Sequence, residues 1–454
     1  MSRAFKAAAL YFAIVFGAGF LLGIARVLWV APRLGPRAAE LLEVPLMLAV
    51  TIVAARWVVR RLALEPKPGT RLGMGLVALA LVLACDFTVV LWLRDQSMRS
   101  YFFNLDPVSA AAYYGALAVF ALVPLFAPPA VARRRRAYVA STLAVLAVGV
   151  AVTYASYRRD LAVERARVAS GSSMAETACG PIEYAALGEG PAVLVVHGAG
   201  GGYDQMLDTA RELAAGGFRV VTMSRFGYLR TPLPVDASPQ AQADAHACLL
   251  DALNIERAAV LGVSAGGPSS MQFALRHPQR TTALVLLVPL AYPALSAERL
   301  SPMAAFMVER AVQSDFLYWA AMSFYPDLVV RTILGTPPEV LARAALDERA
   351  RVHQVMRQIL PLSPRSQGLL NETTVAASLG RYDLERITAP TLVISLKDDG
   401  YGTYAGARYT AEHVPGARFI GYESGGHMLV GHMEEVQAQV KVFLGKPGVV
   451  GMRP

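Results

Sequence analysis

Cysteine is scarce in this sequence of 454 residues, and no histidine occurs in its first third. The three cysteines, Cys85, Cys179 and Cys248, include no close pair, which excludes a cysteine zinc motif and a disulfide-rich scaffold. All seven histidines lie beyond residue 190, so histidine chemistry is confined to the later part of the chain. Charged residues make up 17% of the chain, against about 25% in an ordinary soluble domain, which argues against a purely soluble protein.

The charges are unevenly distributed. Residues 1–160 contain 18 Lys and Arg against 7 Asp and Glu, whereas the remainder contains 25 against 27. This distribution is typical of arginine-flanked membrane helices, and the remainder has no basic stripe interleaved with aromatic residues. We therefore expect a lipid bilayer as a partner and no nucleic acid.

Five apolar runs are long enough to cross a bilayer, which needs about 17–25 residues. The first four predict an all-α transmembrane domain over residues 1–130, and the fifth predicts a span and linker over residues 131–175. The runs are 7–30, 38–59, 72–93, 108–127 and 137–154.

Basic clusters predict how these spans are oriented. Arg3 and Lys6, the group from Arg56 to Arg71, and Arg133 to Arg136 all lie on one side if the N-terminus is cytoplasmic. We therefore expect a multi-pass protein of a bacterial-type cell membrane whose later domain is extracytoplasmic, although the arginines within 158–167 favour the opposite side. Outside the cytoplasm the second and third cysteines are able to oxidise, but the sequence does not show that they are close.

The later part of the chain alternates short β-branched runs with helical stretches. Each run is apolar for about five residues, as in a buried parallel strand. The alternation predicts an α/β domain with a doubly wound, mainly parallel sheet over residues 176–446. Because residues 169–174 are mostly small and polar, we expect a fragment from near Gly171 to carry this whole domain. The expected strands are 192–196, 219–223, 258–262, 282–288, 391–396 and 417–422.

Two glycine-rich turns follow predicted strands. Gly262-Val263-Ser264-Ala265-Gly266 joins a strand to a helix, and its glycines allow an abrupt turn that exposes the Ser264 hydroxyl. An ordinary glycine-rich turn has the same pattern. The second turn runs from His197 to Gly202, and since the chain has no phosphate-loop motif, a nucleotide is not expected there.

An acid and a base follow two later strands. The strand at 391–396 ends before the paired Asp398 and Asp399, and His427 lies on a glycine-rich loop after the strand at 417–422. His432 competes for the role of base, but it opens the following helix, whereas His427 is able to swing over a nucleophile.

Ser264, Asp399 and His427 follow one another in the chain order of an α/β-hydrolase triad. Residues 180–445 thus resemble an α/β-hydrolase fold serine hydrolase of the esterase and cofactor-free haloperoxidase-like type. The resemblance favours Asp399 over Asp398 as the acid, and it assigns the oxyanion hole to the backbone N–H groups of Ala199 and Ala265. It implies a small-molecule acyl or ester substrate, with no metal and no cofactor.

About 100 residues lie between the strands expected at 282–288 and 391–396. This is far more than the connection between two neighbouring strands of an α/β sheet needs. We expect a helical lid over residues 290–386. Its large apolar residues, Trp319 among them, form either a substrate pocket or the lid's own core. Arg225 and Phe226, which end a strand, are candidates for the opposite wall, and Arg225 binds either an acidic substrate group or a structural carboxylate.

The function predicted from these features is a membrane-anchored serine hydrolase that cleaves a carboxylic ester or a related acyl compound. The alternative is a membrane receptor or transport-associated protein whose hydrolase-fold domain binds a ligand without turnover. The complete set of nucleophile, acid, base and oxyanion donors favours the enzyme.

Overall fold

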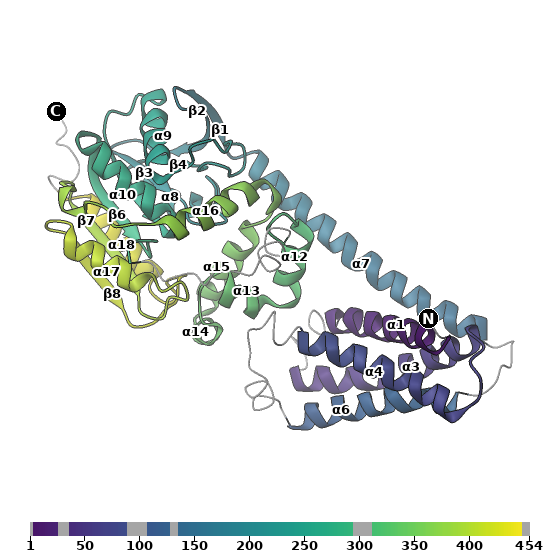
Figure 1. Ribbon diagram of the computed structural model, residues 1–454. Helices are drawn as coiled ribbons and strands as arrows, with labels where there is room; N and C mark the ends of the chain where they lie inside the picture. Colours follow the sequence, from purple (N-terminus) through teal and green to yellow (C-terminus); the bar gives the residue numbers. More distant parts are fainter. Residues whose placement is uncertain (1–2, 26–35, 89–106, 128–134, 294–310, 447–454) are drawn as a thin grey trace. The chain divides into compact units, whose positions relative to one another are not determined.

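A computed structural model describes residues 3–25, 36–88, 107–127, 135–293 and 311–446 (Figure 1). The chain divides into two compact units, Met1–Ser156 and Tyr157–Pro454. Each unit has its own hydrophobic core.

The first unit is helical. Helix α1 packs against α3 and α4, and α6 packs against the same two helices. A helix therefore lies at each of the five places where the sequence predicts a span. The helices are α1 (Arg3–Ala25), α3 (Pro36–Arg61), α4 (Pro68–Thr88), α6 (Pro107–Leu122) and α7 (Arg135–Ala169), of which α7 continues into the second unit.

Close contacts hold this bundle together. The ring of Tyr11 stacks on that of Phe120 at 4.5 Å, and its hydroxyl donates to the Phe120 carbonyl at 2.9 Å. On α4, a Cβ added at Gly75 would lie 2.0 Å from the Ala121 carbonyl oxygen, so only glycine permits this approach of the two backbones. The bundle core thus combines alanines, larger aliphatic side chains and a stacked aromatic pair.

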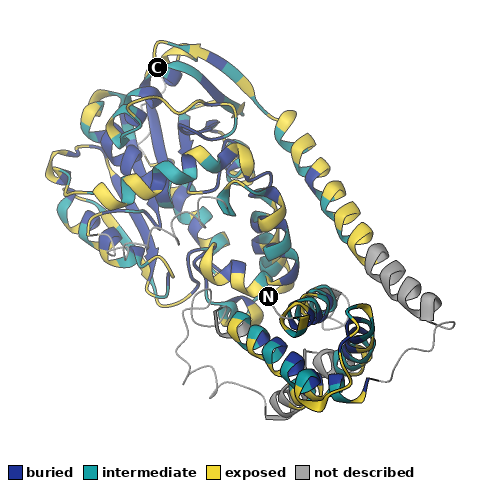
Figure 2. Cartoon of the chain, turned by 45° about the vertical axis from the view of Figure 1, so that its right-hand side comes forward, coloured by how far each residue is buried: buried dark blue, intermediate teal, exposed yellow. Residues whose placement is uncertain are grey.

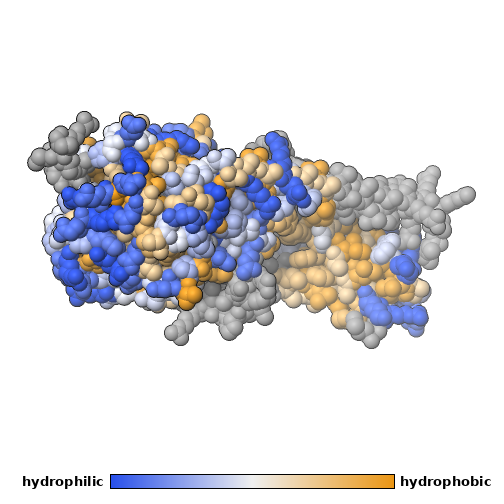
Figure 3. All heavy atoms as spheres, turned by 90° about the horizontal axis from the view of Figure 1, so that it is seen from above, coloured by the Kyte–Doolittle hydropathy of each residue, from blue (hydrophilic) through white to orange (hydrophobic). Residues whose placement is uncertain are grey.

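The bundle also exposes large apolar side chains. Phe20 is 63% exposed and Phe126 is 78% exposed. On the face drawn in Figure 3, the surface of this unit is mostly hydrophobic, whereas that of the second unit is mixed. Among the described residues, two helical segments are long and apolar enough to cross a membrane, Arg3–Gly23 and Pro68–Cys85.

The second unit is built on one eight-stranded sheet in the order β1-β2-β4-β3-β5-β6-β7-β8. The strands from β3 to β8 are parallel to one another, and β1 and β2 add an antiparallel edge. The predicted α/β fold with a mainly parallel sheet is therefore confirmed. The strands are β1 (Ser173–Thr177), β2 (Gly180–Leu187), β3 (Ala192–Val196), β4 (Arg219–Met223), β5 (Ala258–Val263), β6 (Thr281–Leu287), β7 (Thr391–Leu396) and β8 (Arg418–Tyr422).

Helices cover both faces of this sheet, and the strands between them are buried (Figure 2). One face packs against α9 (Pro239–Ala252), α10 (Gly267–Arg276) and α17 (Thr403–His413). The other face packs against α8 (Leu207–Ala215) and α18 (Met433–Leu444). The edge strands β1 and β2 were not predicted, because their residues are only partly buried and form no continuous apolar run.

A helical segment lies between β6 and β7, where the sequence predicts a lid. Its large residues Tyr318, Trp319, Met322 and Phe324 are buried, and Tyr318 donates its hydroxyl hydrogen to the carbonyl of Met356 at 2.7 Å. These side chains form the core of the lid itself. The described lid helices are α12 (Asp315–Phe324), α13 (Pro326–Thr332), α14 (Pro338–Arg343), α15 (Leu346–Gln358) and α16 (Ser366–Ser378).

The last turns of α7 belong to the second unit. Trp319 donates its indole N–H to Asp160 at 2.9 Å, and Arg165 pairs with Asp315 at 3.1 Å. Arg167 donates to Asp204 at 2.6 Å. The linker expected over residues 169–174 is therefore shorter than predicted, because α7 runs to Ala169 and its polar residues bind the lid and the loop after β3.

A fragment that begins at Tyr157 should be more stable than one that begins at Gly171. The shorter fragment lacks Asp160 and Arg167, and hydrogen bonds to charged groups contribute about 1.5–3 kcal/mol each. We expect its free energy of unfolding, measured with urea, to be lower by at least about 2 kcal/mol. In the longer fragment, Arg167→Ala should reproduce part of the loss, and Arg159→Ala, at an exposed position of α7, should not. Equal stability of the two fragments would mean that the fragment from Gly171 already carries the whole domain.

Candidate active site

The predicted nucleophile lies in a strained turn between β5 and α10. Ser264 has φ of +51°, a conformation that non-glycine residues rarely adopt. The flanking glycines are required by close contacts, since a Cβ at Gly262 would lie 2.3 Å from the Ser270 hydroxyl oxygen, and one at Gly266 would lie 2.6 Å from the Val196 carbonyl oxygen. This packing holds Ser264 at the wall of a cavity of about 540 Å³.

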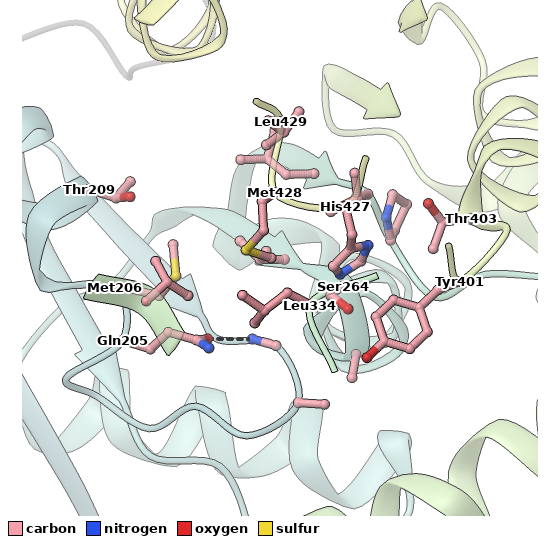
Figure 4. A pocket seen from close by; sticks show the side chains of 18 of the residues that line it. Gln205, Met206, Thr209, Ser264, Leu334, Tyr401, Thr403, His427, Met428 and Leu429 are labelled. Carbon is pink, nitrogen blue, oxygen red and sulfur yellow. Dashed lines mark hydrogen bonds between the residues drawn. The ribbon is translucent and has the colours of Figure 1, made fainter. Parts of the chain in front are cut away.

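His427 and Asp399 form a buried pair beside this serine. The Nδ1 atom of His427 lies 2.8 Å from Oδ2 of Asp399. The carboxylate also accepts the N–H of Tyr401 at 2.8 Å and the hydroxyl hydrogen of Thr403. Since a carboxylate only accepts, Nδ1 carries the proton and Nε2 is left as a base. Ser264 and His427 line the same cavity, and Figure 4 shows both among its lining side chains.

The neighbouring Asp398 has a different partner. Its two oxygens accept the backbone N–H groups of Gly425 and Gly426 at 3.0 and 2.8 Å. Both glycines have positive φ, +135° and +62°. Asp398 therefore shapes the loop that carries His427, whereas Asp399 contacts the imidazole ring itself.

The His197–Gly202 turn lies against the elbow. A Cβ at Gly198 would lie only 3.1 Å from the Cβ of Ser264, and Ala199 and Ala265 both line the cavity. His197 is buried beneath the turn, where its Nε2 accepts the N–H of Arg225 at 3.0 Å. Its Nδ1 therefore donates to the Gly198 carbonyl, at 2.6 Å. Burial and the Arg225 charge hold the pKa of His197 well below its usual value, so the ring is neutral and braces the turn.

Two arginines anchor the other end of this turn. Arg365, from the lid, is fully buried and donates to Asp204 at 2.8 Å and to the Gly201 carbonyl. Arg167, from α7, binds the same carboxylate. Burial opposes ionisation of Asp204, but the two positive charges outweigh it and lower the pKa of the carboxyl. The sequence carries no signal for this cluster, because its members lie far apart in the chain and follow no motif.

The three residues proposed as substrate-binding do not line the cavity within the described part of the chain. Arg225 is buried and pairs with Glu372 of α16, which is the kind of structural carboxylate that the sequence left as one alternative. Phe226 packs into the core, and its N–H donates to Gln242 at 2.8 Å. Trp319 packs against Tyr157 of α7. Each of these three side chains contacts residues of the same chain that are distant in the sequence and that only the tertiary structure brings near.

Comparisons with known proteins identify the fold family of the second unit. A model of the alpha/beta hydrolase fold family matches residues 191–431. The chain is 27% identical over 257 residues to an uncharacterized hydrolase, YcgS, of Bacillus subtilis (strain 168), which covers 55% of this chain and 89% of that protein. It is 32% identical over 127 residues to a 2-hydroxy-6-oxo-6-phenylhexa-2,4-dienoate hydrolase of Comamonas testosteroni, which covers 27% of this chain and 43% of that enzyme.

Solved structures were also found that are similar to part of this chain. An alpha/beta hydrolase fold protein from Nakamurella multipartita matches with 29% identity and a TM-score of 0.49, covering 60% of this chain and 99% of that one.

Changing the two neighbouring aspartates should have unequal effects on hydrolysis. Asp399→Asn leaves an amide at the His427 ring, which stabilises the wrong tautomer, and the equivalent change in a serine protease lowers kcat about 10⁴-fold. Asp398→Asn keeps one acceptor oxygen on the histidine loop, so we expect a loss below about 100-fold, within the range of one positioning contact. The measurement is kcat for p-nitrophenyl acetate with both variants folded by circular dichroism. A larger loss for Asp398→Asn would contradict the roles given to the two residues.

Proposed function

This chain belongs to the α/β hydrolase fold family, and on that premise we propose that it is a membrane-anchored serine hydrolase that cleaves a carboxylic ester or a related acyl compound. One observation carries the proposal. The strained Ser264 and His427 line one cavity, and the buried Asp399 holds the His427 ring there. Ala199 and Ala265 line the same cavity.

The proposed reaction begins at the serine. His427 Nε2 takes the proton of the Ser264 hydroxyl as the oxygen attacks the acyl carbonyl carbon. The N–H groups of Ala199 and Ala265 receive the carbonyl oxygen as it becomes negative. His427 then returns the proton to the leaving alcohol, and an acyl ester remains on Ser264. Water, activated by the same imidazole, releases the acid and restores the serine.

The membrane part of the proposal is supported by the surface of the first unit. Large side chains such as Phe20 and Phe126 are exposed along its helices, where water contact is unfavourable and lipid contact is not. Two segments of this unit are long and apolar enough to span a bilayer. We propose that these helices anchor the hydrolase in the membrane.

The side of the membrane is supported by a disulfide. Cys179 and Cys248 are bonded in the second unit, with their Cα atoms 6.0 Å apart. Disulfides persist in oxidising compartments and are rare in the cytosol. Together with the arginine clusters of the first unit, this bond favours a hydrolase domain outside the cytoplasm.

Ser264→Ala should abolish hydrolysis of p-nitrophenyl acetate, because loss of a triad serine costs on the order of 10⁶ in kcat in a well-studied protease. A fluorophosphonate should label the parent protein and not the variant. Ser269→Ala on the adjacent helix serves as the control and should still be labelled. If Ser264 takes no label while the protein is folded, the ligand-binding alternative replaces the enzyme.

Reporter fusions at the C-terminus should place the hydrolase domain outside the cytoplasm. Alkaline phosphatase fused there should be active, and a fluorescent protein that matures only in the cytosol should stay dark. The physical reason is that positive charges in short loops orient the spans, and the long domain follows the last one. A fluorescent, phosphatase-negative result would mean that the arginines within 158–167 hold the domain inside.

A further inference from the structure

The cavity beside Ser264 extends along α8 and α18, two helices on one face of the sheet, and α15 of the lid also lines it. Met206 precedes α8 and Leu213 lies on it, and both line the cavity opposite Val436 and Val440 of α18. Figure 4 shows Met206 and Thr209 on one wall and Met428 and Leu429 on the other. The passage is therefore an extension of the serine's own cavity into the layer of α8 and α18.

The length of this passage follows from the helices that border it. Its lining on α18 runs from Met433 to Lys441, which at 1.5 Å per residue is about 12 Å. Three single bonds of a fully extended chain advance about 3.6 Å, so about 12 Å accommodates about ten carbon atoms.

The walls and the far end differ in polarity. Leu213, Leu261 and Val440 are almost completely buried and belong to the core on this face of the sheet. At the far end, Lys441 and Glu212 form an ion pair of 2.9 Å in which both side chains are partly exposed. An occupant thus meets mainly apolar side chains, with Thr209 and Gln437 as polar neighbours partway along and the ion pair at the far end. A mainly apolar lining suits a straight hydrocarbon chain.

We propose that this passage binds the acyl chain of the substrate, and that the substrate is an ester of a medium-chain aliphatic acid. The inference rests on the proposed function, because it needs the acyl carbonyl at Ser264. An acyl group attached to the Ser264 hydroxyl oxygen has its carbonyl at the His197–Gly202 turn and its hydrocarbon chain between α8 and α18.

The test is a chain-length series of p-nitrophenyl esters hydrolysed by the full-length protein, kept in solution by an amphipathic polymer. We expect kcat/KM to rise at least tenfold from acetate to octanoate, since one methylene group in an apolar pocket is worth about tenfold or more. The value should not rise further from decanoate to hexadecanoate. A kcat/KM that is highest for acetate would overturn the inference.

Two variants narrow the passage from opposite walls. Thr209→Trp on α8 and Gln437→Trp on α18 should each lower the octanoate-to-acetate ratio of kcat/KM at least tenfold. Ala438→Trp, at an exposed position of α18 that does not line the passage, should leave the ratio within twofold. The second narrowing variant keeps the test valid if the first does not fold. An unchanged ratio in a folded narrowing variant would overturn the inference.

Two further measurements separate the possible failures. If the narrowing variants instead change the preference between ethyl and octyl acetate, the passage holds the alcohol and the inference is wrong. Fluorophosphonate labelling of Ser264 on the same preparation distinguishes the two proposals. A labelled serine without chain-length preference refutes the acyl passage alone, whereas an unlabelled serine with no ester hydrolysis refutes the proposed function beneath it.

Discussion

The buried carboxylate of Asp204 connects parts of the hydrolase unit that are far apart in the chain. It accepts hydrogen bonds from Arg167 at the end of α7 and from Arg365 in the lid, while Arg365 also binds the carbonyl of Gly201. A buried charge that loses one partner costs about 3–5 kcal/mol, so these segments are held together strongly. Together with the Trp319–Asp160 and Arg165–Asp315 contacts, this cluster fixes the relative positions of the His197–Gly202 turn, the lid and the last turns of α7.

Close packing around the serine imposes a second constraint. The glycines before and after Ser264 leave no room for a side chain, and Gly198 approaches the serine from the neighbouring turn. The strain of a positive φ at Ser264 persists because these contacts allow no other backbone path. The two adjacent carboxylates have different partners, since Asp398 shapes the loop that carries His427 and Asp399 orients the His427 ring.

The two units differ in how far they bury their apolar residues. The hydrolase unit buries them on both faces of a sheet, whereas the helical unit leaves many of them exposed. An exposed apolar surface of that kind is stable in lipid and unfavourable in water. The disulfide between Cys179 and Cys248 supports the proposal that the hydrolase unit lies outside the cytoplasm.

Local signals in the sequence determined the parallel strands, the glycine turns around Ser264 and the candidate acid and base. These features depend on the spacing of apolar residues and on backbone sterics within a few residues, and both can be read from a short stretch of sequence. Only the tertiary structure brought Asp399 to the His427 ring, joined Arg225 to Glu372, buried Trp319 against α7 and bonded Cys179 to Cys248. It also revealed the passage between α8 and α18. Each of these outcomes requires residues distant in the chain to meet, and no local pattern encodes which distant partner a side chain will find.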